Sequence, residues 1–96
     1  MRWTWDEAKN QRNERKHGLD FETAQLVFDD PLAVSRADSY PDEERWQTVG
    51  AIDRVIVLVV HTWPLYDPDS DEEVGRIISA RKATKGERRA YDEGNF

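Results

Sequence analysis

The sequence contains no cysteine, which excludes a disulfide framework and thiol chemistry. No apolar run reaches the roughly 18–20 residues that a membrane-spanning helix needs. Residues 1–6 lack the apolar segment of a signal peptide, so we expect a cytoplasmic protein. A phosphate-cradling glycine loop, a zinc ligand set, a serine triad and internal repeats are also missing.

The chain has 96 residues, of which 38% are hydrophobic and 10% aromatic. This length predicts one domain over residues 1–96, near the small end of what folds alone. The apolar content is enough for one thin core.

The net charge of −6 is unevenly distributed along the chain. Residues 18–75 hold three basic and 14 acidic residues, whereas residues 76–89 hold six basic residues and one acid. Residues 2–17 hold five basic residues and three acids. If the fold brings the two basic ends together, they would form a local positive site on an acidic body. The alternative is scattered surface charge that keeps a small protein in solution.

The first basic end predicts a short strand followed by a polar helix. Asp6 can N-cap a helix over residues 7–16, and Gly18 is suited to end it. Ala8 is the only clear core residue of this helix. Five side chains at spacings of three and four residues fall on one face of this helix: Lys9, Arg12, Asn13, Lys16 and His17. Such a helix is either a solvated cover or a working surface.

The middle of the chain changes from a helical to a strand-like pattern. Asp20 can cap a second helix over residues 21–28, which ends at Asp30-Pro31. Strands are expected over residues 32–39 and 45–52. Six branched aliphatic residues at 55–60 predict the central strand of the sheet, extended by residues 61–63. Residues 65–73 read as an acidic solvated loop, because a calcium loop would need glycine where Glu72 stands.

The second basic end, residues 76–89, reads as a strand that leads into a helix. Thr84 and Glu87 have the spacing of a capping box at the start of a helix over residues 85–93. The expected order is β-α-α-β-β-β-β-α. Strands that follow helices with short connections indicate an α+β fold with a mainly antiparallel sheet, two N-terminal helices and one C-terminal helix.

Two histidines are candidates for chemistry. His17 closes the polar helix beside Lys16 and arginine residues, and an imidazole among cations suits a general acid at a phosphodiester. It can equally act only as a C-terminal cap. His61 follows the central strand and is more typical of a hydrogen-bonded structural histidine.

Two arginines in the second basic end compete for a phosphate-binding role. On a regular strand Arg76 and Arg81 point to opposite faces, because they are five residues apart. Arg81, at the strand end, is favoured, since a guanidinium fork binds phosphate and developing charge in a bidentate manner. A structural salt bridge to the acidic middle is the competing interpretation.

Several segments of the chain together form a recognisable pattern. They are Trp5-Asp6-Glu7-Ala8-Lys9, Asn13, Lys16-His17-Gly18, Phe21-Glu22-Thr23-Ala24, Val27-Phe28-Asp29-Asp30-Pro31, residues 45–50, the block Arg76-Ile77-Ile78-Ser79-Ala80-Arg81-Lys82-Ala83-Thr84, and Glu87-Arg88. In this order they resemble the BrnT family. The resemblance implies a type II toxin: a small ribonuclease with a RelE-like fold, held inactive by an antitoxin. The antitoxin would be of the BrnA type, with a ribbon-helix-helix DNA-binding domain, and the complex would repress its own promoter.

Residues and resemblance together predict an RNA endonuclease without metal or organic cofactor. His17 would transfer a proton and Arg81 would stabilise the phosphate, with substrate contacts from Lys16, Arg45, Arg76, Lys82 and Lys85. The partners would be RNA and the antitoxin in a hetero-oligomer, with DNA contacted only through the antitoxin and no membrane involved. The alternative is a non-catalytic module that binds the antitoxin and contributes to promoter autorepression. A weaker third reading is a purely structural domain.

Overall fold

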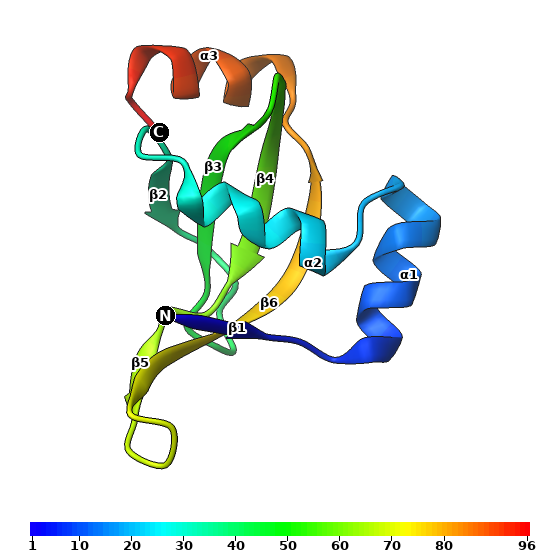
Figure 1. Ribbon diagram of the computed structural model, residues 1–96. Helices are drawn as coiled ribbons and strands as arrows, with labels where there is room; N and C mark the ends of the chain where they lie inside the picture. The colour runs from blue at the N-terminus through cyan, green and yellow to red at the C-terminus, as the bar shows by residue number, and fades with distance from the viewer.

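The computed structural model describes all 96 residues and shows an α+β arrangement around a six-stranded, mainly antiparallel sheet, as the sequence predicted (Figure 1). In chain order its elements are β1 (Arg2–Thr4), α1 (Glu7–His17), α2 (Phe21–Ala24), the 3₁₀ helix η1 (Gln25–Asp29), β2 (Val34–Ala37), β3 (Trp46–Ile52), β4 (Val55–His61), β5 (Leu65–Asp67), β6 (Glu72–Lys82) and α3 (Lys85–Glu93). None of the helices is both long enough and apolar enough to cross a bilayer.

The sheet has the strand order β1-β6-β4-β3-β2, so the aliphatic strand β4 is central, as predicted. β4 is antiparallel to β3 on one side and to β6 on the other. β1 pairs with the first half of β6 in the only parallel arrangement, and β5 pairs with that same half. The second half of β6 therefore has no strand beside it on its outer edge.

The helix ends follow the capping residues expected from the sequence. Asp6 accepts a hydrogen bond from the Lys9 backbone N–H, and Gly18 ends α1 with a left-handed φ of 68°. Thr84 and Glu87 form the complete capping box of α3. These local signals depend only on residues within one turn, which is why sequence reasoning located them.

Three expectations for the middle of the chain differ from the structure in their bounds or in the type of element. The helix expected over residues 21–28 is α-helical only to Ala24 and continues as η1. β4 ends at His61 instead of continuing to residue 63, although the Thr62 backbone N–H still donates a hydrogen bond to the carbonyl of Arg76. The loop expected over residues 65–73 is a hairpin of β5 and β6. The Asp67 carboxylate stabilises its turn by accepting hydrogen bonds from the Asp69 N–H and the Ser70 hydroxyl.

The core lies on the face of the sheet that α2 and η1 cover (Figure 1). Its fully buried members are Phe21, Ala24, Val27, Val57, Val59, Ile77 and Ala80. Gly50 lets η1 approach β3, since a Cβ there would lie 2.9 Å from Val27 Cγ1. Ala8, expected in the core, is exposed, and the buried residue of α1 is Asn13.

β6 contains a β-bulge that changes which side chains share a face. Val60 pairs with Ser79, but His61 pairs with Ile77, so Ile78 is an extra residue. The alternation is reversed across the bulge, because Ile77 and Ala80 both point into the core. It follows that Arg76 and Arg81 lie on the same face of the sheet. The expectation that they point to opposite faces assumed a regular strand and was wrong.

Candidate functional site

Helix α1 is attached to the free outer edge of β6 by one buried side chain. The Asn13 amide nitrogen donates to the carbonyl oxygens of Ala80 and Leu19, both at 2.8 Å, and its oxygen accepts from the Ala80 N–H at 3.1 Å. Asn13 is 7% exposed. Its amide therefore replaces the missing neighbouring strand and satisfies the backbone of Ala80.

The attachment creates a groove between α1 and the bulged part of β6. Its lining consists of Lys9, Arg12, Asn13, Lys16, His17, Ile78 and Ser79. The five residues from α1 are those that helical spacing placed on one face, so that prediction is confirmed. Helix α1, in the first basic end of the chain, packs against β6, but the only residues that β6 contributes to the groove are Ile78 and Ser79.

The groove is cationic even though the whole chain is acidic. None of its basic side chains forms an ion pair, and no carboxylate is in its lining. The acids of α1 lie elsewhere: Glu7, for example, accepts hydrogen bonds from Trp5 and Asn10. Unpaired cations around an open groove are available for an anionic ligand.

Lys16 and His17 thus lie together in the groove, but Arg81 is not part of its lining. The Arg81 guanidinium donates to both carboxylate oxygens of Glu87, at 2.7 and 3.0 Å. This hydrogen bonding holds the pKa of Glu87 below its usual value and raises the pKa of Arg81. Arg81 therefore links the end of β6 to the capping box of α3.

The remaining predicted phosphate ligands fall into two groups along the sheet. Lys82 and Lys85 are exposed near Arg81, at the junction of β6 and α3, and neither forms an ion pair. Arg45 and Arg76 lie at the opposite end of the sheet and pair with Asp38 and Glu43. The rise along β6 separates Arg76 from Arg81 by roughly 15 Å. The structure thus does not gather all seven predicted residues at one place.

His61 is a buried, hydrogen-bonded histidine of the central strand, as the sequence indicated. Its Nδ1 lies 2.8 Å from the Thr62 carbonyl oxygen, which can only accept, so Nδ1 carries the proton. Nε2 consequently accepts from the Thr48 hydroxyl at 2.6 Å, and Thr48 in turn accepts from Ser35. Burial lowers the pKa of His61 and keeps the ring neutral.

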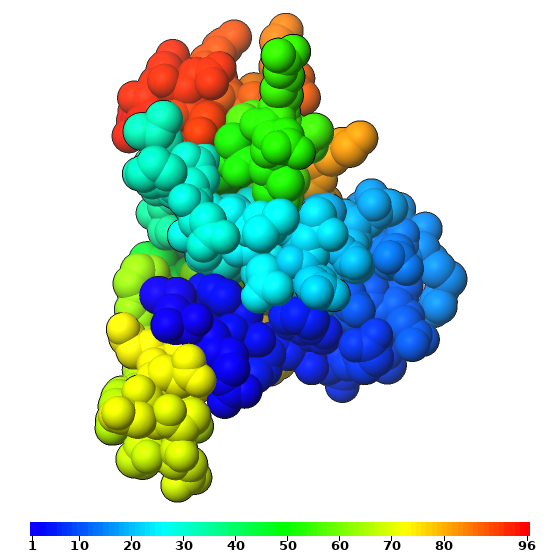
Figure 2. Space-filling view, in the orientation of Figure 1, coloured from blue at the N-terminus to red at the C-terminus, as the bar shows by residue number.

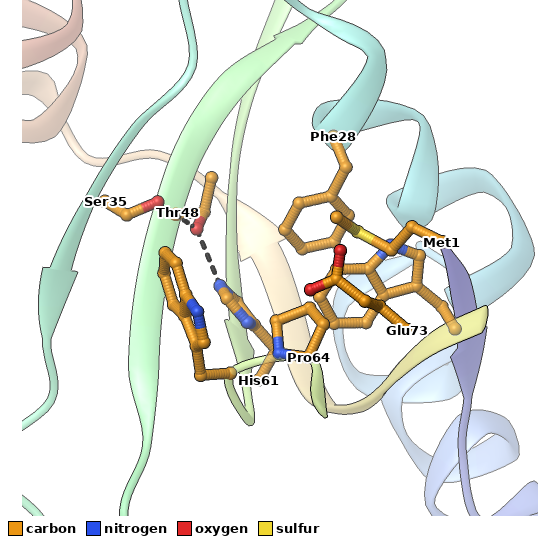
Figure 3. A pocket seen from close by; sticks show the side chains of 9 residues that line it. Met1, Phe28, Ser35, Thr48, His61, Pro64 and Glu73 are labelled. Atoms are coloured by element: carbon orange, nitrogen blue, oxygen red, sulfur yellow. Dashed lines mark hydrogen bonds between the residues drawn. The ribbon is translucent and has the colours of Figure 1, made fainter. Parts of the chain in front are cut away.

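A second cavity lies next to His61, on the core face of the sheet (Figure 3). Its lining is mainly aromatic and apolar and consists of Met1, Trp3, Phe28, Ser35, Thr48, His61, Trp63, Pro64 and Glu73. The Trp3 and Phe28 rings stack with centroids 3.9 Å apart. Sequence reasoning missed this cavity, since Trp3, Trp63 and Glu73 come from segments that only the pairing of both β1 and β4 with β6 brings together.

Comparison with curated proteins finds no match. A family model described as the ribonuclease toxin BrnT of type II toxin–antitoxin systems matches residues 5–87. The match covers α1, the central strands and the whole of β6, and so includes both walls of the cationic groove. The chain therefore belongs to the BrnT family of ribonuclease toxins of type II toxin–antitoxin systems.

Proposed function

We propose that the groove between α1 and β6 binds and cleaves RNA. The observation that carries the proposal is the cluster of Lys9, Arg12, Lys16 and His17, unpaired and without a neighbouring carboxylate, on a chain of net charge −6. Scattered surface charge would not leave four basic groups together on a chain in which acids outnumber basic residues. Phosphates of a single-stranded segment provide the matching anions.

The proposed reaction uses the nucleophile that RNA itself carries. The 2′-hydroxyl oxygen attacks the adjacent phosphorus and releases its proton to solvent, while the bond from phosphorus to the 5′-oxygen breaks. His17, in its protonated form, donates a proton to the leaving 5′-oxygen. The products are a 2′,3′-cyclic phosphate and a 5′-hydroxyl end. Lys16 and Arg12 stabilise the charge that develops on the phosphoryl oxygens.

The donor set of the groove favours a mechanism without a divalent cation. Magnesium prefers carboxylate and other oxygen ligands, whereas the groove offers cationic side chains, one amide and one hydroxyl. Lys9, Arg12 and Lys16 would also repel a metal ion. The cations supply the electrostatic stabilisation for which a nuclease would otherwise use a metal.

We further propose that Arg81, with Lys82 and Lys85, extends the phosphate path beyond the groove. Arg81 retains an Nε–H that is not bonded to Glu87, and its side chain is 37% exposed. It can therefore contact a phosphate while it remains bound to Glu87. Arg45 and Arg76 lie at the opposite end of the sheet and would therefore contact only more distant nucleotides. Both are also ion-paired, with Asp38 and Glu43 respectively.

The partner proposed for this toxin is an antitoxin of the BrnA type that carries a ribbon-helix-helix domain. The complex would be a cytoplasmic hetero-oligomer that contacts promoter DNA through the antitoxin alone. Co-expression with a ribbon-helix-helix protein encoded beside the toxin, followed by co-purification, tests this assignment. Separate elution of the two proteins would contradict it.

The nuclease proposal is tested by incubating the purified chain with single-stranded RNA in the presence of EDTA. We expect cleavage to persist, to leave cyclic phosphate ends and to disappear when a 2′-deoxynucleotide replaces the nucleotide at the cut site. His17→Ala should lower the cleavage rate by about 10²- to 10⁴-fold. Arg15→Ala removes a basic side chain of α1 that does not line the groove, and this control should retain the rate. Loss of cutting with EDTA would refute the metal-free mechanism.

One observation favours a second function, a non-catalytic module that binds the antitoxin and contributes to autorepression. Three of the predicted site residues, the catalytic candidate Arg81 and the substrate ligands Arg45 and Arg76, are ion-paired within the chain. Expression in a bacterium separates the two functions. Growth arrest that His17→Ala abolishes, while antitoxin binding persists, supports the enzyme, whereas normal growth with intact protein supports the module.

A further inference from the structure

The aromatic cavity beside His61 has the features of a binding site that is separate from the cationic groove. It has a volume of about 180 Å³ and lies at the end of the sheet where β1 and the β5–β6 hairpin meet. Figure 2 shows this hairpin, in yellow, projecting next to the dark blue N-terminal segment and away from α1. No residue lines both the cavity and the groove.

The polar floor of the cavity is already satisfied by internal hydrogen bonds. Ser35 donates to Thr48, Thr48 donates to His61, and His61 donates to the Thr62 carbonyl. These groups therefore keep few donors or acceptors for a ligand. The walls, formed by Trp3, Phe28, Trp63 and Pro64, provide aromatic and apolar contact.

Glu73 supplies the single charged side chain of the lining. It alternates along β6 with Gly75 and Ile77, and therefore points to the core face of the sheet. Figure 3 shows its carboxylate directed into the cavity between Pro64 and Met1. Glu73 forms no ion pair, whereas Glu72, one residue earlier, is paired with Arg2. A carboxylate with no cationic partner, directed at aromatic rings, leaves a place for a cation.

We infer that this cavity binds an arginine side chain of a partner protein. The planar guanidinium stacks on tryptophan faces and donates two parallel hydrogen bonds to a carboxylate, which a lysine ammonium does not. The ring of Trp63 is available for such stacking, since the residue is 48% exposed.

Charge and exposure identify the occupant as a polypeptide instead of a nucleotide. A nucleobase would also stack on the tryptophans, but its phosphate would meet Glu73 and the acids of the hairpin, Asp67, Asp69, Asp71 and Glu72. Exposed apolar residues lie at the cavity and next to it: Met1, in its lining, is 70% exposed, and Leu65, which with Trp63 lines a neighbouring depression, is 72% exposed. They provide contact area for the residues that flank the arginine.

The test uses the full-length, ¹⁵N-labelled chain and the peptide acetyl-Gly-Arg-Gly-amide. We expect saturable shifts of the Trp3 and Trp63 indole N–H resonances at millimolar concentration. The matched peptide with citrulline, which is neutral and similar in shape, should bind at least about ten-fold more weakly. Absence of saturable shifts at these two residues up to roughly 10 mM peptide would overturn the inference.

Two variants and one competing ligand complete the test. Glu73→Gln should weaken the arginine peptide about ten-fold or more. Asp69→Asn, which removes a charge from the same hairpin outside the cavity, should change binding less than about two-fold. Equal effects of both substitutions would show only general attraction to an acidic surface and refute a specific site. Tighter binding of adenosine monophosphate than of the peptide would show a nucleotide site instead. RNA cleavage by Glu73→Gln should match the unmodified chain, so this test is independent of the proposed nuclease.

Discussion

The two halves of β6 provide opposite chemical environments on one strand. The first half has a strand on each edge, β1 on one and β5 on the other. It carries Glu73, which lines the aromatic cavity, and the neighbouring Glu72. The second half has β4 on one edge and only Asn13 of α1 on the other, and it borders a cationic groove. The bulge at Ile78 lies between them. A small sheet can thus present an anion site and a cation site that share no residue.

The largest effect should come from reversing charge in the groove. Arg12→Glu combined with Lys16→Glu should lower kcat/KM for RNA cleavage by about 100-fold or more, because two phosphate contacts become repulsive. Steady-state cleavage over a range of salt concentrations measures both the loss and the expected flattening of the salt dependence. The control Arg15→Glu changes a charge on α1 outside the groove. An equal loss in that control would show that net charge, and not the groove, governs activity.

The substitution Gly75→Ala should disrupt the packing of Trp3 against the first half of β6. A Cβ at this position would overlap Cζ3 of Trp3, so the ring must move away from β6. Overpacking of this kind should lower the free energy of unfolding by about 1–3 kcal/mol, measured by urea denaturation. Gly86→Ala is the matched control, since an added Cβ there meets nothing within 4 Å. Retained stability in Gly75→Ala would show that Trp3 is not held against the strand.

The substitution Asn13→Ala tests the attachment of α1 to the second half of β6. The Ala80 N–H and C=O would lose their partner at the strand edge, which should cost about 1–3 kcal/mol of unfolding free energy. Hydrogen exchange of the Ala80 amide should accelerate, because this edge has no strand to protect it. Gln11→Ala, at an exposed position of the same helix, should leave both measurements nearly unchanged.

The smallest expected effect is a pH dependence of the free energy of unfolding that is caused by His61. Burial lowers the pKa of His61 from its ordinary value of 6.5, so the unfolded chain binds a proton that the folded chain excludes. Stability from this group is therefore complete above about pH 6.5 and falls as the pH decreases towards the folded pKa, by at most about 1.4 kcal/mol per pH unit. Urea denaturation between about pH 7.5 and 5.5 measures the slope, and His61→Gln should flatten it. An unchanged slope in the variant would assign the effect to other groups.

Sequence reasoning succeeded where the signal is local or strongly periodic. Asp6, Gly18 and Thr84 identify helix ends within one turn, and the aliphatic run at 55–60 identifies the central strand. The spacing within α1 correctly grouped the five side chains that line the groove. The roles assigned to His17 and Arg81 remain predictions.

The features that sequence reasoning missed arise from tertiary pairing. Nothing in the order Arg76-Ile77-Ile78-Ser79 indicates a bulge, because both isoleucines suit a strand and the extra residue is defined only by its partner strand β4. Asn13 was recognised as part of a polar face, but its role at the edge of β6 depends on where β1 ends. The hairpin at residues 65–73 was hidden by its acidic composition, which predicts a loop in the absence of a neighbouring strand.

The extra residue at Ile78 also determines how β6 can evolve. Up to Ile77 the odd-numbered positions face the core, whereas from Ala80 onward the even-numbered positions do. Tolerance of polar substitutions should therefore follow two patterns, out of step with each other, along one continuous strand. Deletion of Ile78 would bring them into step while Ala80 stays in the core and the guanidinium at position 81 stays on the opposite face, so the loss of this one residue should be better tolerated than a deletion elsewhere in β6.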